Sequence, residues 1–139
     1  AELGVEYADM ETLLRESDVV VLLVPLNKNT FHMMGKEQFA LMKKTAIFIN
    51  DARGNCVDQD ALIEALKNEQ IWGAALDVVT PEPLPADSPL LSIPEDRLIV
   101  TPHQGSSTRE GMTEMFRFAC DNGLRVINGE VPLNIVNGL

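Results

Sequence analysis

The sequence predicts an α/β fold with a parallel β-sheet, because short apolar runs alternate with helical patterns along the chain. The runs at residues 19–24, 46–50 and 72–79 are apolar without alternation, which is typical of strands covered on both faces. The chain has 139 residues, of which 45% are hydrophobic. This is enough for one domain with a hydrophobic core, and it excludes intrinsic disorder.

The first part of the chain contains two predicted helices and two predicted strands. Asp9 is a suitable N-cap for a short helix over residues 10–16, and the first strand is expected over 19–24. A second short helix is expected over 35–42, followed by the second strand over 46–50. A strand–helix–strand order of this kind joins parallel strands.

A longer helix and two further strands follow. Asp58 is expected to cap the helix, whose apolar face is formed by Ala61, Leu62, Ala65 and Leu66. The third strand is predicted over 72–79 and the fourth over 98–100. Residues 80–96 carry five prolines, a density that predicts a loop without regular structure.

The last segment is predicted to be a long helix with an extended tail. The sequence Ser-Thr-Arg-Glu at residues 107–110 has the pattern of a capping box, with Ser107 as the expected cap. The helix has one apolar stripe, which suits either a core or a subunit interface and contains Met112, Met115, Phe116, Ala119 and Cys120. A final extended segment is expected over 129–139.

The charge and cysteine content exclude several classes of partner. The chain has 11 Lys and Arg against 21 Asp and Glu, a net charge of −10. This balance argues against nucleic acid and against an anionic membrane surface as partners. Cys56 and Cys120 form no CxxC motif, which favours a reducing, cytoplasmic compartment. The strongest apolar run, residues 19–26, is too short to span a bilayer.

Three chemically useful residues follow three different predicted strands. Arg53 follows the second strand, Glu82 lies in the loop after the third, and His103 follows the fourth. Ligands of an open parallel sheet bind beyond the carboxyl ends of its strands, so these three residues are expected at one edge. A carboxylate beside an imidazole orients it for proton transfer, and an arginine can bind a substrate carboxylate through two hydrogen bonds.

Together these groups suit a small 2-hydroxy or 2-oxo acid as substrate. Arg53 would anchor the acid, and His103 would move the proton of the hydroxyl group. Side chains supply no hydride acceptor, so a nicotinamide cofactor, NAD or NADP, is expected. No metal site is predicted, because His32 has no partner at metal-ligand spacing.

Four segments resemble the signature segments of the D-isomer-specific 2-hydroxyacid dehydrogenases. They are VPLNKNT, INDARGNCVDQDAL, GAALDVVTPEPLP and TPHQGSST. That family includes D-3-phosphoglycerate dehydrogenase, glyoxylate/hydroxypyruvate reductase and phosphite dehydrogenase. The resemblance extends over essentially the whole chain. It implies that residues 1–106 form the second half of a Rossmann-type nucleotide-binding domain and that 107–139 return to the substrate domain.

The resemblance also implies roles for individual residues. Arg53, Glu82 and His103 match the catalytic residues of the family. The residues expected to line the cofactor are Val24, Pro25, Asp51, Ala52, Arg53, Asp77, His103, Gly105 and Ser106, with Asp77 at the nicotinamide carboxamide. Two positions depart from the family pattern, since Asp51 replaces a Thr, Ser, Cys or Val and Gln104 replaces an aliphatic residue.

The glycine-rich cofactor motif of the family is not among these residues. No GxGxxG occurs in the sequence, so the chain is expected to be the C-terminal part of a longer dehydrogenase and inactive alone. The longer protein is expected to be a homodimer. Two alternatives stay open, namely an NAD(H)-sensing scaffold similar to a transcriptional corepressor and an enzyme of the phosphite dehydrogenase type.

Overall fold

The computed structural model describes residues 4–135, which form two compact units. The first unit ends at His103, and the second begins at Gln104.

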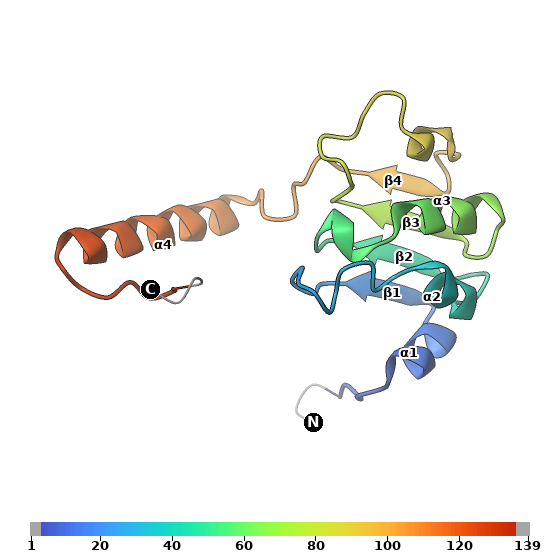
Figure 1. Ribbon diagram of the computed structural model, residues 1–139, viewed down its shortest axis with the longest axis horizontal. Helices are drawn as coiled ribbons and strands as arrows, with labels where there is room; N and C mark the ends of the chain where they lie inside the picture. Colours follow the sequence, from blue (N-terminus) through green and yellow to red (C-terminus); the bar gives the residue numbers. More distant parts are fainter. Residues whose placement is uncertain (1–3, 136–139) are drawn as a thin grey trace. The chain divides into compact units, whose positions relative to one another are not determined.

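The first unit is a four-stranded parallel sheet with helices (Figure 1). Its strands are β1 (Val19–Leu22), β2 (Ile47–Asn50), β3 (Gly73–Leu76) and β4 (Leu98–Val100), in the order β1-β2-β3-β4. Its α-helices are α1 (Met10–Glu16), α2 (Lys36–Leu41) and α3 (Gln59–Lys67), and its 3-10 helices are η1 (Gly54–Cys56) and η2 (Pro89–Ser92). The predicted parallel α/β fold is therefore confirmed, although the first three strands are shorter than expected.

Within this unit, the helices cover one face of the sheet. The strand sequences, which are apolar without alternation, predict instead that both faces are covered. Val20, Phe48 and Leu76 point into the face that α2 and α3 cover and are nearly inaccessible to solvent. Val21 and Ile99 point to the opposite face and are 51% and 62% exposed. The reason is topological, because right-handed crossovers that all advance in one direction place their helices on the same side.

The core lies between this sheet face and the helices. Phe39 of α2 and Phe48 of β2 are fully buried and pack edge to face, with ring centroids 5.3 Å apart. Leu62 and Leu66 present the apolar face of α3, as the sequence predicts, and are also buried. Burial of such side chains contributes about 1.5–3 kcal/mol each and fixes α3 against the sheet.

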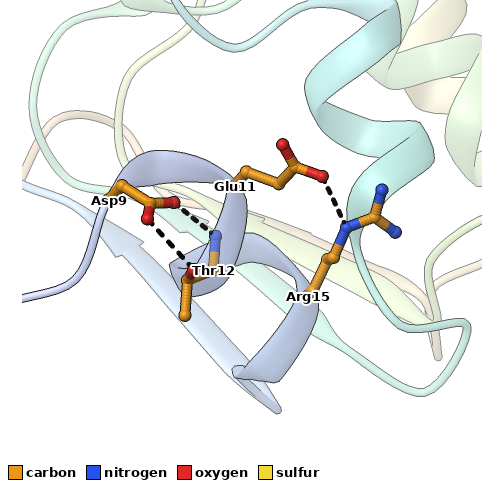
Figure 2. A network of polar contacts seen from close by, with 4 residues as sticks. All are labelled: Asp9, Glu11, Thr12 and Arg15. Carbon is orange, nitrogen blue, oxygen red and sulfur yellow. Dashed lines mark hydrogen bonds and ion pairs between the residues drawn. The ribbon is translucent and has the colours of Figure 1, made fainter.

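Helix α1 begins at the predicted cap, Asp9 (Figure 2). The Asp9 carboxylate accepts from the backbone N–H of Thr12 at 2.8 Å and from the Thr12 hydroxyl at 3.2 Å. Glu11, in the first turn of the helix, pairs with Arg15, which lies one turn further along, at 2.9 Å. The backbone N–H of Thr12, and after it the hydroxyl, hold the pKa of Asp9 below its usual value of 3.8.

This cap gives the stability of α1 a pH dependence. A carboxyl whose pKa is lower in the folded state stabilises that state fully above the unfolded pKa. Its contribution is lost as the pH falls from 3.8 through the lower folded value. We expect Asp9→Asn, which keeps a capping oxygen, to lose this acid dependence of α1 helicity. Amide hydrogen exchange of Thr12 between pH 2 and 5 measures it, and equal pH profiles for both proteins would contradict the assignment.

Of two further predicted features, the cap of α3 is confirmed and the proline-rich loop differs in detail. Asp58 caps α3 as expected, accepting from the N–H of Ala61 at 3.2 Å. The proline-rich loop is not wholly irregular, because η2 forms within it. Pro89 occupies the first turn of η2, where its missing N–H and fixed φ do no harm, and the buried Leu90 anchors the turn to the core.

The second unit contains α4 (Arg109–Ile127), which is capped by Thr108 rather than by the predicted Ser107. The Thr108 hydroxyl accepts from the N–H of Gly111 at 3.0 Å. Ser107 instead donates its N–H to the Gln104 carbonyl in the preceding turn, so it lies one residue before the cap. Glu110 is thereby the second residue of the helix, where its charge favours the N-terminus without a capping box.

The apolar stripe of α4 is not buried within the second unit. No described residue of α4 is buried, and Phe116 is 64% exposed. A core role for the stripe inside this unit is therefore wrong. The expected extended tail forms no strand over residues 129–135, and residues 136–139 lie outside the described part.

Candidate active site

The turn after β2 is shaped by a buried asparagine. Asn50 ends the strand and is 1% exposed. Its amide nitrogen donates to the carbonyl of Arg53 at 3.2 Å, and its amide oxygen accepts from the N–H of Ala52 at 3.1 Å. These two bonds fix the backbone of Arg53 just beyond the carboxyl end of the sheet.

Arg53 itself is exposed and lines a hollow of about 520 Å³. One guanidinium nitrogen, Nη1, donates to the carbonyl of Ala52 at 2.6 Å. An arginine has five N–H donors, so most of them are available to a ligand. The hollow is lined by residues after β1 and β2, namely Leu23, Val24, Pro25, Leu26, Asp51, Ala52 and Arg53. Five of these are predicted cofactor-side residues.

Glu82 and His103 come together at the same sheet edge. Nδ1 of His103 lies 2.7 Å from Oε1 of Glu82, although 21 residues separate them. The His103 and Glu82 side chains are 43% and 40% exposed, so both remain accessible to a ligand. Because the contact occupies Nδ1, the other ring nitrogen, Nε2, is the atom suited to exchange a proton with a substrate.

The backbone of His103 adopts an uncommon conformation. Its φ is +54°, in the left-handed region that residues other than glycine rarely enter. The N–H of His103 donates to the carbonyls of Asp77 and Thr101, both at 3.0 Å, and these bonds hold the conformation. Backbone conformations of this kind are concentrated at functional sites, where they direct a side chain.

Asp77 lies on the wall of a second hollow, of about 490 Å³. The hydroxyl of Thr101 donates to its carboxylate at 2.5 Å. The lining is mostly apolar and consists of Asp77, Val79, Glu82, Pro83, Leu84, Val100, Thr101 and Pro102. Its volume is in the range of small-molecule sites, and a carboxylate can accept several hydrogen bonds at once. The hollow therefore has the size and lining of a site for a small organic ligand.

The predicted residues thus fall into separate groups. Arg53 lines one hollow and Glu82 the other, and within residues 4–135 no residue lines both. The two groups approach each other at Gly54, whose backbone lies so close to the Val79 carbonyl and the Thr80 hydroxyl that a Cβ would overlap both. Gly105 and Ser106 lie in the turn that begins the second unit.

Gly54→Ala tests this junction. A Cβ at this position would lie 2.1 Å from the Val79 carbonyl oxygen and 2.4 Å from Oγ1 of Thr80. Backbone must move to relieve such contacts, so we expect a loss of about 1–3 kcal/mol in the free energy of unfolding. Urea denaturation measures it. Gly123→Ala is the control, since a Cβ there meets nothing within 4 Å, and equal losses for both variants would contradict the packing.

Sequence reasoning assigns no role to three residues that shape this edge. They are Asn50, Gln59 and Thr101. Asn50 is detectable in principle, because an amide at the end of an apolar strand is typical of a turn. Thr101 follows a strand directly, but its bond to Asp77 depends on the pairing of β3 with β4.

A parallel sheet with hollows and polar side chains beyond its carboxyl ends is typical of ligand-binding α/β domains, a class that includes the dinucleotide-binding domains. Residues 1–105 match the NAD-binding domain of the D-isomer specific 2-hydroxyacid dehydrogenases. The chain belongs to this family. The match confirms the resemblance stated from the four motifs and the expectation of NAD or NADP as cofactor.

Two curated relatives and one solved structure illustrate the similarity. The glyoxylate reductase of Korarchaeum cryptofilum is 47% identical over 136 residues, and the alignment covers 98% of this chain and 40% of the relative. The glyoxylate/hydroxypyruvate reductase B of Klebsiella pneumoniae is 50% identical over 131 residues, with coverages of 94% and 40%. The crystal structure of D-lactate dehydrogenase with NAD+ from Lactobacillus jensenii superimposes with a TM-score of 0.82 at 38% identity, with coverages of 94% and 43%.

The chain therefore spans about 40% of the length of the curated relatives that it matches. In the part of the chain that the structure describes, no helix is long and apolar enough to cross a membrane. The same residues contain no cluster of three or more His, Cys, Asp or Glu that could hold a metal ion.

Proposed function

We propose that the intact protein is an NAD(P)-dependent oxidoreductase that interconverts a small 2-hydroxy acid and the corresponding 2-oxo acid. The observation that carries the proposal is the 2.7 Å contact between Nδ1 of His103 and Glu82 at the ligand-binding edge of an NAD-binding domain. The names of the relatives, which are reductases of glyoxylate and hydroxypyruvate, support a two- or three-carbon 2-oxo acid as the substrate class.

Each catalytic residue of this chain has a role that follows from the chemistry of its side chain. Arg53 binds the substrate carboxylate through two N–H groups and polarises the neighbouring carbonyl. His103, as imidazolium, donates a proton from Nε2 to the carbonyl oxygen during reduction and accepts it back during oxidation. Glu82 accepts from Nδ1, keeps the ring oriented and stabilises its charged form.

The cofactor-side residues have a separate task. Asp77 is suited to accept from a carboxamide N–H₂, and the apolar wall of Val79, Leu84 and Val100 is suited to a ring face. A bound nicotinamide would supply the hydride in reduction and accept it in oxidation. Val24, Pro25, Asp51 and Ala52 line the hollow beside Arg53, where they would bound the cofactor and exclude water from the acid.

Turnover by the intact protein tests the proposal. We expect oxidation of NADH or NADPH, followed by absorbance, when glyoxylate or hydroxypyruvate is added. Cofactor binding without turnover of any 2-oxo acid would favour the NAD(H)-sensing scaffold. Turnover of NAD+ with phosphite alone would favour the phosphite dehydrogenase type.

We also propose a cellular location and an oligomeric state for the intact protein. Cys56 and Cys120 are both free thiols, which supports a reducing compartment such as the cytoplasm. We further propose that the intact enzyme is a homodimer and that residues 107–139 lead back to the substrate domain.

A further inference from the structure

The loop that carries Glu82 is held at its start by one side chain. Gln59, the first residue of α3, donates from Nε2 to the carbonyl of Thr80 at 2.7 Å. Its Oε1 accepts from the N–H of Thr80 at 3.0 Å. A single amide thereby satisfies both backbone groups of a residue that lies 21 positions further along the chain.

Among the described residues, the backbone of 80–84 makes hydrogen bonds only through Gln59. Pro81 and Pro83 have no N–H, so the loop has few donors with which to anchor itself. The backbone of Gly54 lies close to Thr80, since a Cβ there would overlap its hydroxyl, but no hydrogen bond between the two is found among the described residues. The amide of Gln59 is therefore the hydrogen-bonding anchor of the loop just before Glu82.

We propose that Gln59 is a positioning residue. It holds Glu82 against Nδ1 of His103 by hydrogen-bonding both the N–H and the carbonyl of Thr80. This inference rests on the proposed function, in which Glu82 orients His103. The chain from Thr80 to Glu82 is only two residues long, so a displaced Thr80 displaces the carboxylate. Proton transfer depends steeply on such placement, since an error of about 1 Å can lower the rate about 100-fold.

The two hydrogen bonds to Thr80 require an amide side chain, because they need one donor and one acceptor at the same site. An ionised glutamate has acceptors only, so in Gln59→Glu a carboxylate oxygen would face the Thr80 carbonyl and repel it. A protonated glutamate regains an O–H donor. Gln59→Glu should therefore recover as the pH falls toward the ordinary glutamate pKa of about 4.3.

The test compares three variants of the intact enzyme. Gln59→Leu removes both bonds at similar volume, Gln59→Glu removes the donor only, and Asp60→Asn changes an exposed neighbour in the same turn. For Gln59→Leu we expect kcat with glyoxylate to fall about 10- to 100-fold, with KM changed much less. For Gln59→Glu we expect a kcat below that of wild type, and the difference between the two should become smaller toward acid pH. Asp60→Asn should match wild type.

A spectroscopic readout makes the test independent of turnover. In ¹H–¹⁵N spectra of the imidazole rings of the intact enzyme, the signals of His103 are assigned by their loss in His103→Ala. We expect the Nδ1–H signal that is bonded to Glu82 in wild type to broaden or vanish in Gln59→Leu and to persist in Asp60→Asn. If Gln59→Leu does not fold, the same comparison is made with Gln59→Glu at neutral and acid pH.

The outcomes separate the two proposals. A folded Gln59→Leu with wild-type kcat and an unchanged His103 signal would overturn the positioning role. A loss of kcat that comes with a loss of thermal stability, while the His103 signal stays intact, would make Gln59 merely structural and would also overturn it. Absence of turnover in wild type would reject the proposed function, while the imidazole spectra would still decide the role of Gln59.

Discussion

His103→Ala in the intact enzyme is expected to lower kcat by about 10²- to 10⁴-fold, the usual contribution of a general acid–base group. The affinity for NADH should stay nearly unchanged, because the side chain acts on the substrate proton. The ring also loses its contact with Glu82, which then has no imidazole to orient. Single-turnover kinetics and cofactor titration measure the two quantities separately.

His32→Ala provides the matched control for this variant. His32 is also exposed and also has a positive φ, of +49°. Its ring stacks on Phe31 with centroids 4.0 Å apart, whereas the ring of His103 contacts a carboxylate. His32→Ala should therefore leave kcat close to wild type. A His103→Ala enzyme with more than about a tenth of wild-type turnover would exclude His103 from general acid–base chemistry.

Arg53→Lys is expected to lower kcat/KM for a 2-oxo acid by about 100-fold, mostly through KM. A lysine keeps the charge but has no planar pair of donors, so it loses one of two charge-assisted hydrogen bonds to the carboxylate. Such bonds contribute about 1.5–3 kcal/mol each, which corresponds to roughly 10- to 150-fold in affinity. Steady-state kinetics with glyoxylate as substrate measure the effect.

The methyl ester of the same acid serves as the control substrate. An ester has no carboxylate, so wild type and Arg53→Lys should use it with similar, low efficiency. The turn itself should be preserved, because Asn50 binds the backbone of residue 53 and not its side chain. If Arg53→Lys used the free acid as well as wild type does, Arg53 would not be the carboxylate anchor.

The sequence predicts the arrangement of the sheet well, because apolar runs and N-caps are local signals. Asp9 and Asp58 each cap the expected helix, since one side chain and the three residues after it suffice to form a cap. The end of the third strand is less predictable. Val78 and Val79 are buried but lie beyond β3, so their apolar character reflects burial and not strand pairing.

The residues that meet at the carboxyl edge of the sheet are also partly predictable from the sequence. Glu82 and His103 are expected together because both follow neighbouring strands, and the structure brings them within 2.7 Å. The contact of Gln59 with Thr80 is not predictable in this way, because it depends on the path of a proline-rich loop across 21 residues. The division of Arg53 and Glu82 between two hollows likewise depends on side-chain directions that no periodic pattern encodes.

The proposal that Arg53, Glu82 and His103 act on one acid is tested most directly by a crystal structure of the intact enzyme with NADH and oxamate, an unreactive analogue of a 2-oxo acid. We expect the oxamate carboxylate to pair with the guanidinium of Arg53. Its amide-bearing carbonyl oxygen should lie within hydrogen-bonding distance, about 2.6–3.2 Å, of Nε2 of His103, while Nδ1 stays on Glu82. Oxamate bound away from Arg53, or His103 turned from both the ligand and Glu82, would contradict it.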